Sequence, residues 1–154
     1  MLAYPLTISL IIAFSLIPSV SVAEQFIASA KVQITDSIEI TQNAGLNFGQ
    51  IEARNGVCSM SSGGVLDGSQ GQTCSGQSSP GSFTISATTG RAVNFSVSAN
   101  GAVNGVTLQP QVDGSAMRVA ESNTITLEVI GSLQLENATP GALSISYTLT
   151  ANYN

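Results

Sequence analysis

The chain has 154 residues, a formal net charge of −5 and no histidine. Charged residues make up only 8% of it, against about 25% in an ordinary soluble domain. This balance excludes nucleic acid as a partner, because neutralising phosphate requires clustered Lys and Arg. Without histidine the chain lacks the commonest general base and metal ligand, so we expect neither a cofactor nor a metal site.

Residues 1–23 have the pattern of a secretory signal peptide. None of them is charged, and residues 6–20 form an almost unbroken apolar run. The run is shorter than the ~20 apolar residues of a membrane-spanning helix and has the length of a signal-peptide core. We place cleavage after Ala23, at the site Ser21-Val22-Ala23 that follows Pro18; an uncleaved anchor is the alternative. Residues 24–154 are then a secreted or cell-surface chain of single-domain size.

The segment directly after this site, residues 24–35, alternates apolar and polar side chains. Its apolar positions are Phe26, Ala28, Ala30, Val32 and Ile34, and Ile27 alone breaks the alternation. A period of two is typical of a strand with one buried face. No glycine or proline separates this segment from residues 36–41, so it also fits the first strand of the domain that follows.

Alternation of period two dominates residues 36–154, which we assign to one β-sandwich domain. The alternating runs cover residues 82–87, 93–99, 124–129 and 143–153, with a shorter run at 38–40. Turn dipeptides such as Asn100-Gly101 and Pro140-Gly141 separate the runs, and no segment has helical periodicity. Seven or more short strands with such turns predict an all-β, antiparallel sandwich.

Residues 55–81 differ from the rest because Ser, Gly and Gln dominate them. We predict a long exposed loop here, with a short ribbon at residues 64–66, which is either a binding loop or a tolerated surface insertion. In an exported chain, Cys58 and Cys74 predict a disulfide. It would close a loop of about 17 residues and contribute ~3 kcal/mol. A metal site at the two cysteines is the alternative to a disulfide, but the chain has no histidine and no acidic cluster near them.

No catalytic pattern is present. The chain has neither a Gly-x-Ser-x-Gly nucleophile motif nor a glycine-rich phosphate loop. Its only lysine, Lys31, lies on the polar face of an alternating segment, and its nine acidic residues are scattered. We therefore expect no enzymatic activity.

Several motifs follow one another along the chain. Leu46-Asn47-Phe48-Gly49-Gln50-Ile51 comes first, followed by a Gly-rich segment and strands at residues 81–86 and 93–97. An element at 127–133, then Pro140-Gly141 and an alternating strand ending in Tyr153-Asn154, complete the series. This series resembles DUF4402-type domains and, more distantly, chaperone–usher pilins and spore coat protein U-like subunits. The resemblance implies an immunoglobulin-like, pilin-like sandwich and implies no ligand.

The resemblance also implies a mode of assembly. Pilin subunits lack one strand, and the N-terminal extension of a neighbour fills the gap by β-strand addition. Residues 24–35 fit such a donor strand, with Phe26, Ala28, Ala30, Val32 and Ile34 entering the neighbour. We therefore expect a structural subunit of an extracellular fimbria or surface fibre, assembled by donor-strand exchange.

The partners expected from this resemblance are further copies of the chain or related subunits, with a periplasmic chaperone and an outer-membrane usher. Two alternatives stay open at this point. Residues 24–35 fit the first strand of the chain's own sandwich equally well. The protein also fits a monomeric secreted binding module, an adhesin or carbohydrate-binding domain that uses the loop at 55–81.

Overall fold

The computed structural model describes residues 29, 31 and 37–154. The expected signal peptide and the candidate donor residues Phe26, Ala28, Ala30, Val32 and Ile34 lie outside these residues. Regular structure in the described part is β apart from one 3-10 turn, η1 (Ser62–Gly64). The strands are β1 (Glu39–Ala44), β2 (Gln50–Ile51), β3 (Gly56–Met60), β4 (Leu66–Ser69), β5 (Cys74–Ser75), β6 (Gly81–Ser86), β7 (Ala92–Ala99), β8 (Ala102–Val103), β9 (Val106–Val112), β10 (Met117–Val119), β11 (Thr124–Leu135) and β12 (Tyr147–Tyr153).

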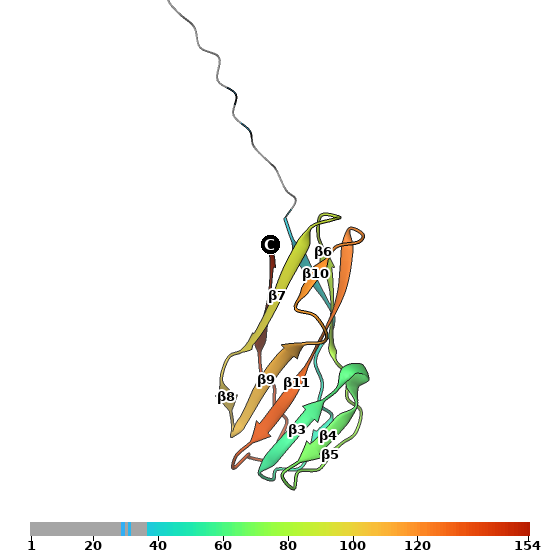
Figure 1. Ribbon diagram of the computed structural model, residues 1–154. Helices are drawn as coiled ribbons and strands as arrows, with labels where there is room; N and C mark the ends of the chain where they lie inside the picture. The colour runs from blue at the N-terminus through green and yellow to red at the C-terminus, as the bar shows by residue number, and fades with distance from the viewer. Residues whose placement is uncertain (1–28, 30, 32–36) are drawn as a thin grey trace, which may run out of the picture. The chain divides into compact units, whose positions relative to one another are not determined.

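Two antiparallel layers make up the domain of residues 37–154 (Figure 1). The larger sheet has the order β1-β6-β11-β3-β4, and β9 joins it by pairing with β11 and β8. The smaller sheet has the order β10-β7-β12, and β2 and β5 form a separate short ladder. The predicted all-β, antiparallel, sandwich-like fold is confirmed.

The longest strand, β11, connects the two halves of the domain. Its first half pairs with β6, whereas its second half lies between β3 and β9. Ile125, Leu127, Val129, Leu133 and Leu135 are all buried on it, as the alternating pattern of a strand with one core face requires.

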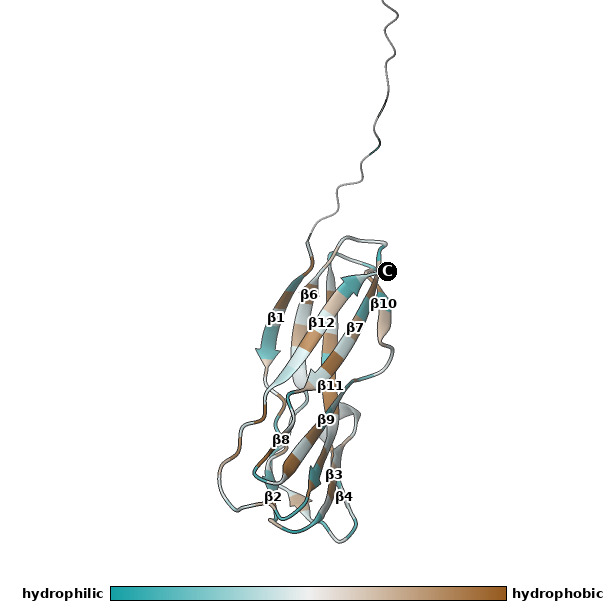
Figure 2. Ribbon diagram, turned by 90° about the vertical axis from the view of Figure 1, so that its left-hand side faces the viewer, coloured by the Kyte–Doolittle hydropathy of each residue, from teal (hydrophilic) through white to brown (hydrophobic). Residues whose placement is uncertain are grey.

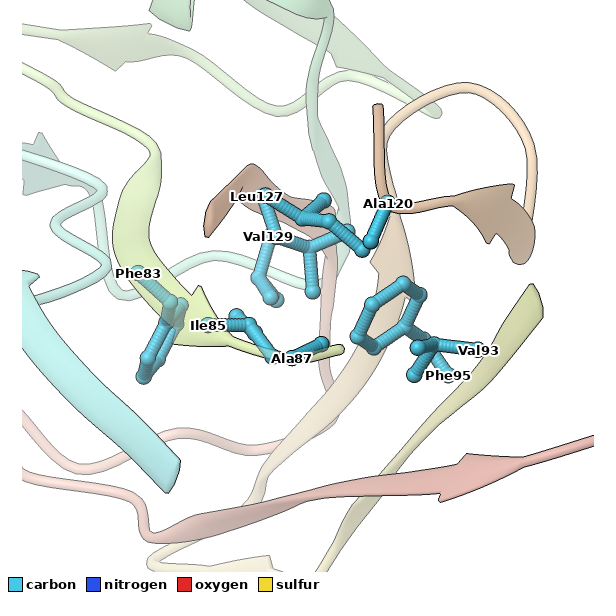
Figure 3. Packing of buried hydrophobic residues seen from close by; sticks show 9 residues of the cluster. Phe83, Ile85, Ala87, Val93, Phe95, Ala120, Leu127 and Val129 are labelled. Atoms are coloured by element: carbon cyan, nitrogen blue, oxygen red, sulfur yellow. The ribbon is translucent and has the colours of Figure 1, made fainter. Parts of the chain in front are cut away.

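The core has two apolar clusters. The first joins the two sheets and is shown in Figure 3. It contains the buried residues Phe83, Ile85, Ala87, Val93, Phe95, Ala120, Ile125, Leu127 and Val129. The second cluster lies around the second half of β11 and contains Phe48, Cys58, Met60, Val106, Leu108, Ile130, Leu133 and Leu135. Because β2 is short and residues 142–146 form no strand, irregular chain covers much of this second cluster.

The structure corrects the expectation of an exposed loop over residues 55–81. Within this segment β3 pairs with β11 and β4 pairs with β3, while Cys58 and Met60 are buried. The alternation of Val57, Ser59 and their buried neighbours is too short to stand out in a Ser- and Gly-rich sequence. The segment is exposed in β4, where only Leu66 is partly covered, and in the turns, where Val65 is 67% exposed.

The final strand is shorter than the sequence predicts. Alternation begins at Leu143, but β12 begins only at Tyr147. Residues 142–146 have no strand assignment, and the only backbone bond in this stretch outside a ladder runs from Asn100 N–H to the Ser146 carbonyl, at 3.3 Å. Ile145 packs against the second core cluster, whereas Leu143 is 39% exposed, so the alternation extends beyond the residues that form the strand.

Candidate functional site: an open sheet edge and an apolar cleft

One side of the domain ends in two edge strands, each of which is paired along one margin only. Among the described residues, β1 pairs only with β6, and β12 pairs only with β7. We call the outer margins of β1 and β12 together the open edge; Figure 2 looks onto β12, with β1 along the left-hand border. An unpaired strand margin presents a row of backbone donors and acceptors that can template another strand.

The hydrogen bonds of β12 show which backbone groups face outward. The Ser146 carbonyl accepts from Asn100, and the Asn154 amide donates to the Ala92 carbonyl, both in the β12–β7 register. In an antiparallel pair, bonded residues alternate along the strand. The even-numbered residues therefore bond to β7, and residues 147, 149, 151 and 153 direct their N–H and C=O groups to the open edge.

Apolar side chains beside the open edge are incompletely covered. Ile40 of β1 lies opposite Ile85 of β6 on the same sheet face. Ile85 is 0% exposed, whereas Ile40 is 38% exposed. On β12, Leu149 packs against the first cluster and is only half-buried. Both sheets thus lack the neighbour that would cover the core at this margin.

The opposite side of the sandwich is bridged by Arg118 of β10. Its guanidinium donates to the Thr126 carbonyl of β11 at 2.8 Å and to the Asp113 carbonyl at 2.5 Å. These bonds use an otherwise unpaired carbonyl of β11 and tie the connection between β9 and β10 to both layers. On the open-edge side, the Tyr153 hydroxyl of β12 accepts from the Thr88 amide at 2.8 Å, which joins the two layers at one end of that side.

At one end, the open edge continues into an apolar cleft of about 420 Å³. Its walls are residues 46–53 and residues 138–147, and its floor is formed by β9 and β11. The lining side chains include Phe48, Val106, Leu133, Leu143, Ile145 and Tyr147. A cleft of this size with an apolar lining is suited to holding apolar side chains.

The wall at residues 46–53 is fixed by Gly49 and the disulfide. Gly49 has φ +66°, and a Cβ there would lie 2.8 Å from the Ser75 carbonyl oxygen, so the motif requires glycine at this position. Cys74 pairs with Ile51 in the β2–β5 ladder and forms the predicted disulfide with Cys58 of β3. The cleft wall is thereby attached to the central part of the larger sheet.

Tyr147 lies where the open edge meets the cleft. Its ring contacts Phe83 edge-to-face, with centroids 6.3 Å apart, and its hydroxyl is buried with no hydrogen-bond partner among the described residues. Burial raises the pKa of the Tyr147 hydroxyl above its usual value of 10.0, and the nearby Leu46 backbone acts in the opposite direction. The phenol is therefore held neutral between the two clusters.

This raised pKa predicts a loss of stability at alkaline pH. Unfolded Tyr147 titrates near pH 10.0, and the folded residue titrates higher. Its contribution is therefore complete below pH 10.0 and is lost as the pH rises through the folded pKa. Urea unfolding between pH 8 and 11 should show this decline, and Tyr147→Phe should weaken it. An identical pH profile for Tyr147→Phe would contradict the assignment; Tyr153→Phe is the matched control.

The structure brings together some of the residues singled out in the sequence. Cys58 and Cys74 form the disulfide, and the motif of residues 46–51 lines the cleft. The five candidate donor residues lie outside the described part of the chain, so their use stays a prediction. The resemblance to pilin subunits implied a missing strand, but nothing in the sequence indicated which strands border the open edge.

Within residues 37–154, no helix has the length and apolar character needed to cross a membrane. No group of three acidic, histidine or cysteine side chains gathers in that part of the chain. The model of the family described as "Domain of unknown function (DUF4402)" matches residues 38–153. No curated protein and no solved structure matches the chain significantly.

Proposed function

We propose that this chain, which belongs to the DUF4402 family, is a structural subunit of an extracellular fimbria or surface fibre. Assembly proceeds by donor-strand exchange, in which the N-terminal segment of one copy pairs with the open edge of another. The observation that carries the proposal is the open edge, where unpaired backbone groups of β12 and half-covered core residues lie side by side. A donated strand satisfies both at once.

Residues 24–35 are the segment that fits this edge. Their apolar residues, Phe26, Ala28, Ala30, Val32 and Ile34, recur every second position. A strand with this pattern directs all five side chains to one face, toward the core, while the polar residues face water. Removal of residues 1–23 as a signal peptide leaves this segment at the N-terminus of the exported chain.

The same proposal assigns partners and place. The partners are other copies of the chain or related subunits, and the fibre lies at the cell surface. Before assembly, an open edge with uncovered apolar side chains favours aggregation. A periplasmic chaperone that covers the edge, and an outer-membrane usher that releases it, would prevent this. The role is structural, without catalysis.

Deleting residues 24–35 from the exported chain is expected to abolish fibres. The truncated subunit keeps its domain but has no strand to donate, so electron microscopy of the cell surface should show none. Val32→Asp should act in the same way, because it places a charge in the core of the neighbour. Gln33→Asp on the polar face is the matched control and should leave fibres intact. Fibres of normal length from the truncated chain would contradict the proposal.

A second candidate function is a monomeric binding module. It is supported by a polar pocket of about 350 Å³, lined mainly by the amide side chains of Asn55, Gln70, Gln134 and Asn137 together with Glu136. Its lining includes no aromatic ring of the kind sugar sites usually present. A mature protein that stays monomeric and unfolds in one reversible step would favour this function.

A further inference from the structure

We infer that Ser115, Arg118 and Ser122 prevent strand addition at the side of the sandwich formed by β10 and the first half of β11, which we call the closed side. Copies of the chain are thereby kept from joining edge to edge there. This inference rests on the proposed function and goes beyond it, because it assigns a role to residues away from the open edge and the cleft. It follows from where the outward-facing backbone groups of the two strands find hydrogen-bond partners.

β10 is the edge strand of the smaller sheet opposite β12. Among the described residues it pairs only with β7. The Phe95 amide donates to the Ala116 carbonyl at 2.7 Å, so the even-numbered residues of this register bond to β7. Met117 and Val119 therefore direct their backbone groups outward, and they are 52% and 55% exposed. An edge of this kind can template a further strand.

Ser115 occupies the outward backbone groups of Met117. Its hydroxyl donates to the Met117 carbonyl at 2.8 Å and accepts from the Met117 amide at 3.3 Å. Serine hydroxyls readily form such local bonds with the backbone two residues along the chain. Both groups that a second strand would need at this residue are therefore in use. Val119 is the one other outward residue of β10, and a single residue offers too few bonds to hold a strand.

The first half of β11 has an outward margin on the same side. β9 and the residue after it cover this margin as far as Asp113, whose amide donates to the Glu128 carbonyl at 2.9 Å. Because bonded residues alternate along an antiparallel strand, Thr126 and Thr124 direct their backbone groups to the same margin, beyond the end of β9. A strand could add to β11 at this point if the groups were free.

Arg118 and Ser122 cover this part of β11 with side chains. The Ser122 hydroxyl donates to the Thr124 carbonyl at 3.1 Å and accepts from the Thr124 amide at 3.5 Å, which repeats the arrangement of Ser115. Arg118 donates to the Thr126 carbonyl, and its Nε also donates to the Ser115 carbonyl at 3.2 Å. Side chains thus occupy backbone groups of both strands where another strand would bind.

β12, the other edge strand of the smaller sheet, has no such protection. Within residues 37–154, no side chain is hydrogen-bonded to the backbone groups that residues 147–153 direct to the open edge. The two edges of one sheet therefore differ in their capacity to accept a strand. With the closed side blocked, each copy accepts a strand at the open edge alone, and the fibres remain single.

Removing two hydroxyls from the full exported chain tests the inference. Ser115→Ala with Ser122→Ala frees the backbone groups of Met117 and Thr124, and the domain keeps its fold because both serines are exposed and lie outside the strands. Edge contacts repeat at every subunit, so weak pairing adds up along two fibres. We expect bundled fibres in electron microscopy and a several-fold rise in the fraction that sediments at low speed. The matched control, Ser115→Thr with Ser122→Thr, keeps both hydroxyls and should give single fibres.

A third variant locates the contact between fibres. Val119→Lys, added to the alanine pair, places a charge on β10, and a charged side chain on an edge strand opposes pairing with another edge. Single fibres from this variant support the inference. Bundles that persist in it show association through another surface and overturn the inference. Alanine-pair fibres that stay single, with the circular dichroism of the native protein, also overturn it.

The outcome for the proposed function is separate. A chain that forms no fibre even without substitutions removes the proposed function, and sedimentation velocity of the same proteins then decides the inference. Dimers or larger species from the alanine pair, with the native chain and the threonine pair monomeric, support the closed side. Monomers from all three proteins overturn it.

Discussion

Replacing Leu127 by alanine is expected to lower the free energy of unfolding by about 2–5 kcal/mol. Leu127 is 0% exposed and lies opposite Phe83 in the β11–β6 ladder, within the first core cluster. Its neighbours come from both sheets, so the surrounding chain cannot collapse into the space that the lost methyl groups leave. Urea unfolding followed by circular dichroism measures the loss.

The matched control is Leu149→Ala on β12. Leu149 packs against the same cluster but is only half-buried, because it lies beside the open edge. Both substitutions should be compared in a subunit that lacks residues 24–35, so that no donated strand covers the edge. We expect Leu149→Ala to lower the free energy of unfolding clearly less than Leu127→Ala does. An equal decrease in the free energy of unfolding for the two variants would mean that β12 is covered in the subunit alone, which would contradict the open edge.

Strands with one buried face and one solvated face could be predicted from the sequence. The alternating runs at 82–87, 93–99 and 124–129 correspond to β6, β7 and the first half of β11. In these strands one face is buried and the other is solvated, so apolar and polar side chains alternate along the sequence. The disulfide between Cys58 and Cys74 was also predicted, from export and from the lack of other ligands.

Two other features could not be predicted, for different physical reasons. β3 is buried between β11 and β4, yet it is short and lies among Ser and Gly residues, so its pattern is weak. The open edge is a property of pairing, and pairing depends on which strands meet in space. Ile145 packs against the second cluster and Leu143 lines the cleft while 39% exposed, so the alternation at these residues does not show which strand lacks a neighbour.

Removing the disulfide is expected to have the second large effect. Cys58→Ala with Cys74→Ala should lower the free energy of unfolding by ~3 kcal/mol, because the unfolded chain loses a cross-link over a loop of about 17 residues. The alanine pair adds no polar group at position 58, which is 0% exposed. Urea unfolding of both proteins, with and without a reductant, measures this. The reductant should destabilise the native protein and leave the double variant unchanged.

The loss of stability on removing the disulfide should also be uneven across the domain. Cys74 attaches the β2–β5 ladder to β3, and β2 belongs to the wall of the apolar cleft. Amide hydrogen exchange in the double variant should therefore speed up at residues 46–53 before it does in β11. Uniform exchange across both segments would show that the disulfide stabilises the domain as a whole and does not specifically support the cleft.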